Sequence, residues 1–277
     1  MAETILSDRR TFSAVAMLFL AATIGNAQMQ TKQTVDGVTL DAPGSAEFQA
    51  AVDRIGATAT VNQLGPAKDY FVAIEFNTPT RVSGYRTLFE LTNGPLESVR
   101  HLVRRVNGIE PVDLGAGAVM LAAPAPLDRI ANEINSNPKT PLPSTPLLGD
   151  LAGRAVTASV DSVTLADGTF VGPDTLNLYD RLVNREAAVA IFFERLRSRL
   201  ADGTARSWLQ SVASTPPLNN AGERHGLETT DLAGAAVYKR AAVALQMYDG
   251  GKQTEMQRWI SVEGERLRSA PKLRRAQ

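Results

Sequence analysis

The stretch that decides the fold runs from Ala155 to Leu200, and it opens with AVTASVDSVTLA at residues 155–166. Side chains alternate between two faces along this segment, as is typical of a strand. The turn sequence Asp167-Gly168-Thr169 follows. Asp174 or Thr175 then offers a helix N-cap, after which apolar residues recur at helical spacing. The stretch therefore predicts a change from sheet to helix just before Asp174.

The part of the chain after this change predicts a small α-helical bundle. Apolar residues fall on one broad face of a long helix that ends near Leu200. Shorter helices are predicted at Ala205 to Ala213, from Asp231 to Tyr248 and from Thr254 onward. Several such helices are enough to enclose one hydrophobic core.

The part of the chain before the change predicts a sheet. Several short apolar segments are separated by turn residues, and no crossover helices lie between them. This arrangement favours an antiparallel, immunoglobulin-like β-sandwich. The predicted strands are Thr58 to Leu64, Asp69 to Asn77, Ser83 to Thr92, Leu96 to Asn107, Val112 to Ala123 and Ala155 to Ala166. The pattern of Leu96 to Asn107 also fits a helix, and we favour the strand only slightly.

The predicted fold class is therefore α+β, a β-sandwich followed by a helical region. Pro124 to Gly149 holds six of the 15 prolines and predicts a long surface excursion from the sandwich. The predicted organisation is a signal peptide at 1–27, a tether with a short helix at 28–57, a β-sandwich domain at 58–173 and an α-helical region at 174–277.

The N-terminal residues predict export. Arg9 and Arg10 precede an apolar run from Phe12 to Ile24, and Gly25-Asn26-Ala27 offers a cleavage site. The run is short for a membrane span, which needs about 20 residues, so an uncleaved anchor or a buried helix is the weaker interpretation. We expect an exported bacterial protein, periplasmic or secreted, with no stable membrane span after cleavage. The pattern leaves the general and twin-arginine export routes open.

Composition restricts the possible partners and chemistry. The chain of 277 residues has 29 acidic and 29 basic residues, so no excess of charge directs it toward nucleic acid. It has no cysteine, which rules out disulfides and thiolate catalysis. The last twelve residues hold five basic residues and no acidic one, and we expect them to form a solvated, frayed terminus.

No catalytic, cofactor-binding or metal-binding residue is predicted. The chain lacks the glycine and serine motifs of nucleotide-binding proteins and hydrolases. His225 with Glu228 and Asp231 is the one cluster that mixes imidazole and carboxylates, and a solvated loop explains it better than a metal site. His101 is interpreted as a surface residue.

Glu186 is unusual because it falls near the centre of the apolar face of the long helix. An uncompensated buried carboxylate is costly, so we expect a cationic partner. Lys239 and Arg240 are the natural candidates, and Arg197 lies on the same helical face. A structural ion pair is favoured over a role in ligand binding.

Two segments carry a resemblance to known proteins. Val160 to Asp174 and Val82 to Tyr85 resemble strands of uncharacterised exported bacterial proteins that combine an immunoglobulin-like or fibronectin-like sandwich with a helical region. The resemblance implies this architecture over about Tyr70 to Leu200 and implies no catalytic residues.

These observations predict a non-catalytic protein of the cell envelope. We expect the sandwich to present an edge or loop face to an envelope or extracellular protein, because a sheet edge can accept a partner's strand. The alternative is an envelope hydrolase that uses Glu186, or His225 with Glu228 and Asp231.

Overall fold

A computed structural model provides the fold. It describes residues 29–93, 98–104, 113–124, 127–139, 141–142, 144, 146–175, 177–216 and 231–276. The predicted signal peptide at 1–27 lies outside these residues. In the described ranges, no helix combines the length and the apolar character needed to cross a membrane.

The larger sheet is built around β7 (Val156–Leu165). One side of β7 pairs antiparallel with β4 (Val82–Asn93), which in turn pairs antiparallel with β5 (Ser98–Arg104). Two strands share the other side of β7. β1 (Met29–Lys32) runs parallel to its first half, and β8 (Thr169–Val171) runs antiparallel to its second half.

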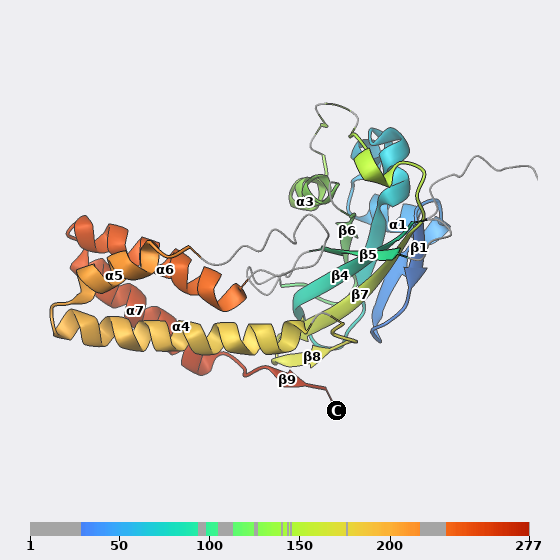
Figure 1. The fold of residues 1–277 in the computed structure, drawn as a ribbon. Coiled ribbons are helices and arrows are strands. Elements are labelled where there is room, and N and C mark those ends of the chain that lie inside the picture. Colours follow the sequence, from blue (N-terminus) through green and yellow to red (C-terminus); the bar gives the residue numbers. More distant parts are fainter. Residues whose placement is uncertain are drawn as a thin grey trace, which may run out of the picture.

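A smaller antiparallel sheet and a C-terminal strand complete the β structure. The smaller sheet has the order β2 (Val38–Asp41), β3 (Val72–Phe76) and β6 (Ala118–Ala122). The last strand, β9 (Arg274–Arg275), runs parallel to β8 at the edge of the larger sheet. The end of the chain therefore returns to the sheet (Figure 1).

The two sheets share one hydrophobic core. Phe76 of β3 and Tyr85 of β4 contact each other with ring centroids 5.0 Å apart. Ile74 of β3, Phe89 of β4 and Val160 of β7 belong to the same core and are fully buried. Burial of apolar surface contributes about 25 cal/mol per Å², so this shared core helps to hold the two sheets together.

The predicted antiparallel, immunoglobulin-like sandwich is wrong. The larger sheet is mixed, because β1 and β9 join it in parallel, and the smaller sheet holds only three strands in the described chain. Alternation of side chains fixes which face of a sheet each residue occupies, but it does not fix the neighbouring strand or its direction. The strands at residues 82–93 and 156–165 are confirmed, whereas their inferred arrangement is not.

Short helices accompany the sheets. They are α1 (Ala46–Arg54), α2 (Thr58–Asn62), the 3-10 helix η1 (Gly65–Tyr70), α3 (Asp128–Ser136) and the 3-10 helix η2 (Gly149–Leu151). α1 contacts β3, and α3 contacts β6. The Ser45 hydroxyl caps α1 by accepting from the Phe48 amide at 3.0 Å, as expected for an N-cap serine.

Two segments differ from their predicted structure. Residues 58–64 were expected to form a strand but contain α2, in which Thr60 and Val61 are buried. The Thr60 hydroxyl donates to the Pro138 carbonyl at 2.6 Å, a distant contact that sequence spacing does not reveal. Residues 28–44, expected to be a tether or an irregular first edge of the sheet, contain two regular strands, β1 and β2.

The helical region confirms the helices predicted from the sequence. It consists of α4 (Leu178–Ala201), α5 (Ala205–Ala213), α6 (Leu232–Asp249) and α7 (Gln253–Ser269). α4 extends away from the sheets, and the other three helices lie along it (Figure 1). Aromatic rings fill their shared core: Phe192 stacks on Trp208 with centroids 5.4 Å apart, and Phe193 meets Trp259 edge-on at 5.0 Å.

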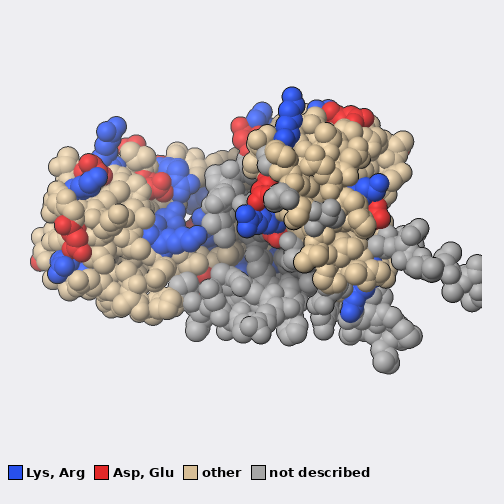
Figure 2. Space-filling model, turned by 90° about the horizontal axis from the view of Figure 1, so that it is seen from above, with Lys and Arg blue, Asp and Glu red and all other residues tan. Residues whose placement is uncertain are grey.

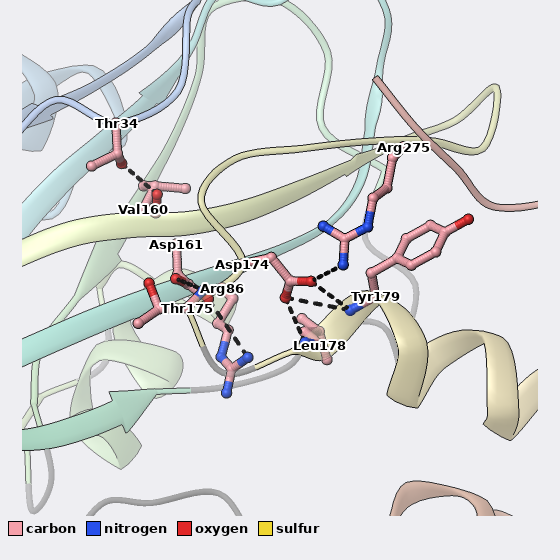
Figure 3. A network of polar contacts seen from close by, with 9 residues as sticks. All are labelled: Thr34, Arg86, Val160, Asp161, Asp174, Thr175, Leu178, Tyr179 and Arg275. Carbon is pink, nitrogen blue, oxygen red and sulfur yellow. Dashed lines mark hydrogen bonds and ion pairs between the residues drawn. The ribbon is translucent and has the colours of Figure 1, made fainter. Parts of the chain in front are cut away.

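Polar contacts join the sheet to α4 (Figure 3). The backbone carbonyl of Asp161 in β7 accepts from the Asp174 amide at 3.1 Å, and its Oδ1 accepts from the Thr175 amide at 2.8 Å. The Asp174 carboxylate accepts from the amides of Leu178 and Tyr179, the first residues of α4. The N-cap residue of α4 is therefore Asn177 and not the predicted Asp174 or Thr175, although the Asp174 carboxylate still satisfies amides at the start of the helix.

Candidate functional site

The strongest candidate site is a pocket of about 510 Å³ in the helical region, which we call the basic pocket. Its volume falls within the range of about 300–1,000 Å³ that is usual for small-molecule sites. α4, α6, α7 and the chain that follows α7 all contribute to it. The described lining consists of Val183, Arg185, Glu186, Ala187, Val189, Ala190, Arg240, Arg266, Leu267, Ala270, Pro271, Lys272 and Leu273.

Four cations line the basic pocket, against one carboxylate. Arg185 comes from α4, Arg240 from α6, Arg266 from α7 and Lys272 from the C-terminal segment, while Glu186 supplies the carboxylate. Figure 2 shows Lys and Arg side chains gathered on the side of the helical region that faces the sheets. The described lining therefore carries a formal excess of positive charge in a chain whose net charge is zero.

The arginines affect each other electrostatically. Burial lowers the pKa of Arg185, and the positive charges of Arg240 and Arg266 lower it further. Burial also lowers the pKa of Arg240; Arg266 adds to this effect, whereas Glu263 opposes it. Like charges that converge in a partly desolvated space repel one another more strongly than they would in water. A bound anion would relieve this repulsion.

Hydrogen bonds hold two of these arginines in place. Arg240 donates from Nη1 to the Ala236 carbonyl at 3.2 Å, one turn earlier in α6. Arg266 donates from Nη2 to Glu263 at 2.9 Å, one turn earlier in α7. Each guanidinium group has five N–H donors, so these bonds leave further donors on each group for a ligand.

Glu186 does not form the predicted buried ion pair. Glu186 lines the pocket with much of its surface open to solvent, and in the described part of the chain no ion pair joins it to Lys239, Arg240 or Arg197. Partial burial raises its pKa, while Arg185 and Arg266 act in the opposite direction. The prediction failed because α4 is covered on only part of its surface, so its apolar stripe is not buried throughout. Arg197 instead donates to the Ile260 carbonyl at 3.3 Å.

The predicted histidine cluster is not tested as a site. His225 and Glu228 lie outside the described residues, as does the side chain of His101. Asp231 has a structural role, because its Oδ1 accepts from the Gly234 amide at 2.9 Å and caps α6. Within the described ranges, no group of three or more His, Asp and Glu side chains is placed to hold a metal ion.

The basic pocket was not predicted, although the sequence shows some of the residues that form it. Arg240 interrupts an otherwise apolar helix, and this suggested a partner for Glu186 rather than a site. Arg266 and Lys272 belong to the basic C-terminal residues expected to form a solvated terminus, yet they line the pocket. Helices that are far apart in the sequence bring these cations together, so no local sequence motif predicts the arrangement. Comparison of the chain with protein families, curated proteins and solved structures gives no match.

Proposed function

We propose that this protein is a non-catalytic binding protein whose basic pocket takes a small amphipathic anion. The ligand would carry a carboxylate or phosphate group attached to an apolar body. The observation that carries the proposal is the convergence of Arg185, Arg240, Arg266 and Lys272 on one pocket that contains a single described carboxylate. Export to the periplasm or beyond, predicted from residues 1–27, forms part of the proposal.

The two halves of this ligand follow from the two kinds of lining residue. Guanidinium groups bind carboxylates and phosphates through paired, charge-assisted hydrogen bonds, and partial burial strengthens these bonds. Val183, Val189, Leu267 and Leu273 supply apolar surface beside the cations. An anion without an apolar part would leave that surface unused, so an amphipathic molecule fits the lining better than an inorganic ion.

Fluorescence titration with anilinonaphthalene sulfonate (ANS), an anion with an aromatic body, tests this proposal. Arg240→Gln is expected to weaken ANS binding about tenfold, because it removes a charge-assisted contact. Lys239→Gln is the matched control. Lys239 is the neighbouring cation on α6, is exposed and does not line the pocket, so its loss should leave ANS affinity unchanged.

Competition separates the proposal from nonspecific dye binding. Hexyl phosphate and hexanoate are expected to displace ANS, and hexanol at the same concentration is not. Equal ANS affinity in the two variants, or equal displacement by hexanol, would contradict the proposal. The emission of the two tryptophans, both in the helical region, confirms that each variant is folded.

One observation favours the alternative of an envelope hydrolase. Glu186 lines the pocket and has a raised pKa, a property that is common in general acids. This alternative requires turnover of an ester or a phosphoester that Glu186→Gln abolishes without loss of ANS binding. The binding protein proposed above would show no such turnover.

A further inference from the structure

The C-terminal tail, residues 270–276, is docked on the protein. The Arg274 amide donates to the Gly168 carbonyl at 3.0 Å, and the Ala276 amide donates to the Phe170 carbonyl at 2.9 Å. These bonds add β9 to the edge of β8 as a parallel strand. Leu273 packs against Phe170 and the start of α4. The expectation of a frayed terminus is therefore wrong for this segment, although six of its seven residues are exposed to solvent.

Arg275 has a recognition site of its own (Figure 3). Its Nη2 donates to Asp174 Oδ2 at 2.8 Å, and the carboxylate of Asp174 is 1% exposed. The Arg275 guanidinium also lies 4.6 Å from the centroid of the Tyr179 ring and 6.0 Å from that of Phe170. A buried carboxylate beside two aromatic rings satisfies both the charge and the flat faces of an arginine.

Other contacts fix the register of the tail. Arg274 donates from Nη2 to Asp167 at 2.9 Å and from Nε to the Thr169 hydroxyl at 3.2 Å. The Tyr179 hydroxyl donates to the Leu273 carbonyl at 3.2 Å. Two successive arginines, Arg274 and Arg275, are thus bound by two different aspartates, Asp167 and Asp174. We call the surface that holds the tail, made of Asp167, Thr169, Phe170, Asp174 and Tyr179, the tail groove.

The same tail forms one wall of the basic pocket. Ala270, Pro271, Lys272 and Leu273 line the pocket, and Arg274 and Arg275 follow them immediately in the chain. Contacts at the tail groove therefore hold this wall in position. Releasing Arg275 would free the residues that close the pocket on this side.

We propose that the tail groove is a recognition site for an extended peptide with two successive arginines, that the protein's own tail occupies it, and that this docking closes the basic pocket. The contacts of β9 alone support the recognition step. The closing step rests on the proposed function, because it requires a ligand in the pocket.

The first test uses the full-length chain with Arg275→Ala. Amide hydrogen exchange of the tail is expected to be slow in the wild type and about tenfold or more faster in the variant, because the loss of Arg275 removes a charge-assisted bond to a buried carboxylate. Arg268→Ala is the matched control, since Arg268 is exposed on α7 and does not line the pocket. It should leave tail exchange slow.

A second measurement tests whether peptide binding to the tail groove depends on the arginine side chain. A labelled peptide with the sequence of residues 271–277 is expected to bind the Arg275→Ala protein, whose own tail is released. Its counterpart with Arg275→Ala should bind about tenfold more weakly. Fast tail exchange in the wild type, or equal binding of the two peptides, would overturn the recognition step.

The rate of ANS dissociation tests the closing step. ANS is expected to dissociate about tenfold faster from the Arg275→Ala protein than from the wild type, because the tail no longer closes the pocket. Unchanged dissociation from a protein whose tail is released would overturn the closing step. Failure of the proposed function gives a different result from failure of the tail proposal. If only the proposed function fails, the Arg240→Gln and Lys239→Gln variants bind ANS equally, but Arg275→Ala still accelerates amide exchange of the tail.

Discussion

Arg86 and Asp161 form an ion pair that is enclosed by the two central strands of the larger sheet. Nη1 of Arg86 lies 3.6 Å from Oδ2 of Asp161, and the two side chains are 0% and 1% exposed. Arg86 lies at an irregularity of the pairing between β4 and β7, where the register shifts by one residue. The pair lies next to the amides that begin the connection to α4, because Asp161 also accepts from Thr175.

Removing one member of this pair is expected to destabilise the fold strongly. Arg86→Met keeps much of the apolar stem but leaves the Asp161 carboxylate buried, and such a loss costs about 3–5 kcal/mol. The free energy of unfolding in urea measures it. The double variant Arg86→Met with Asp161→Asn should be more stable than Arg86→Met alone, because the uncompensated charge is gone.

An exposed ion pair provides the control for that experiment. Arg81 and Asp113 also pair across distant segments, but their side chains are 57% and 75% exposed. Water and salt screen such pairs, so Arg81→Met should leave the urea midpoint unchanged within error. A similar loss for Arg81→Met and Arg86→Met would show that burial of the Arg86 pair is not what matters.

Asp174 is expected to be sensitive to substitution for three reasons. Its φ is +52°, which disfavours alanine, and its carboxylate accepts both from amides at the start of α4 and from Arg275. Asp174→Ala should cost about 2–3 kcal/mol from backbone strain and the lost cap, and the loss of the bond to Arg275 adds to this cost. Asp174→Asn should cost less, because asparagine tolerates this conformation and retains an acceptor oxygen.

Asn177→Ala isolates the contribution of backbone strain. Asn177 has a φ of +54° but makes no capping hydrogen bond through its side chain. Its replacement should therefore show the backbone strain alone. Thermal unfolding followed by circular dichroism compares the variants, and an equal loss for Asp174→Ala and Asn177→Ala would count against both the cap and the bond to Arg275.

Gly168 is expected to control the position of the tail. It has a φ of +84°, and a Cβ atom there would lie 2.4 Å from the Lys272 carbonyl oxygen. Gly168→Ala should therefore displace β9 and accelerate amide exchange at residues 274–276. Gly203→Ala introduces similar backbone strain at a φ of +76° but has no atom within 4 Å of its Cβ. It should not affect the tail, and acceleration in both variants would point to general destabilisation.

The sequence predicts local structure in this protein far better than it predicts the contacts between distant segments. Leu182, Val189, Phe193 and Leu196 recur at helical spacing, and all are buried in α4 as expected. The bounds of β7 differ from its predicted range by one residue at each end. These features depend on periodicity, which a single segment contains in full.

The features that sequence analysis missed depend on partners far away in the chain. Residues 29–32 look polar and irregular, and they form β1 only because β7 offers an edge. The tail looks like a solvated basic terminus because Asp174 lies 101 residues away from Arg275. The basic pocket is missed for the same reason, since its cations come from four separate segments.

Glu186 provides a test of the electrostatics of the basic pocket. Burial raises its pKa above the ordinary value, despite the opposing effect of Arg185 and Arg266. A carboxyl group with a raised pKa binds its proton more tightly in the folded than in the unfolded state. Its contribution to stability is therefore fully present below the unfolded pKa and is lost as the pH rises through the folded pKa.

Glu186→Gln should remove this dependence. The variant is expected to be more stable than the wild type at neutral pH, and the advantage should shrink as the pH falls below the Glu186 pKa. Urea unfolding followed by tryptophan emission, at neutral pH and at about pH 4, measures the difference. The opposite sign, a variant that is less stable at neutral pH, would mean that attraction to Arg185 and Arg266 outweighs burial. In the expected case, protonation of Glu186 also makes the pocket more positive, so ANS should bind the wild type more tightly in mild acid.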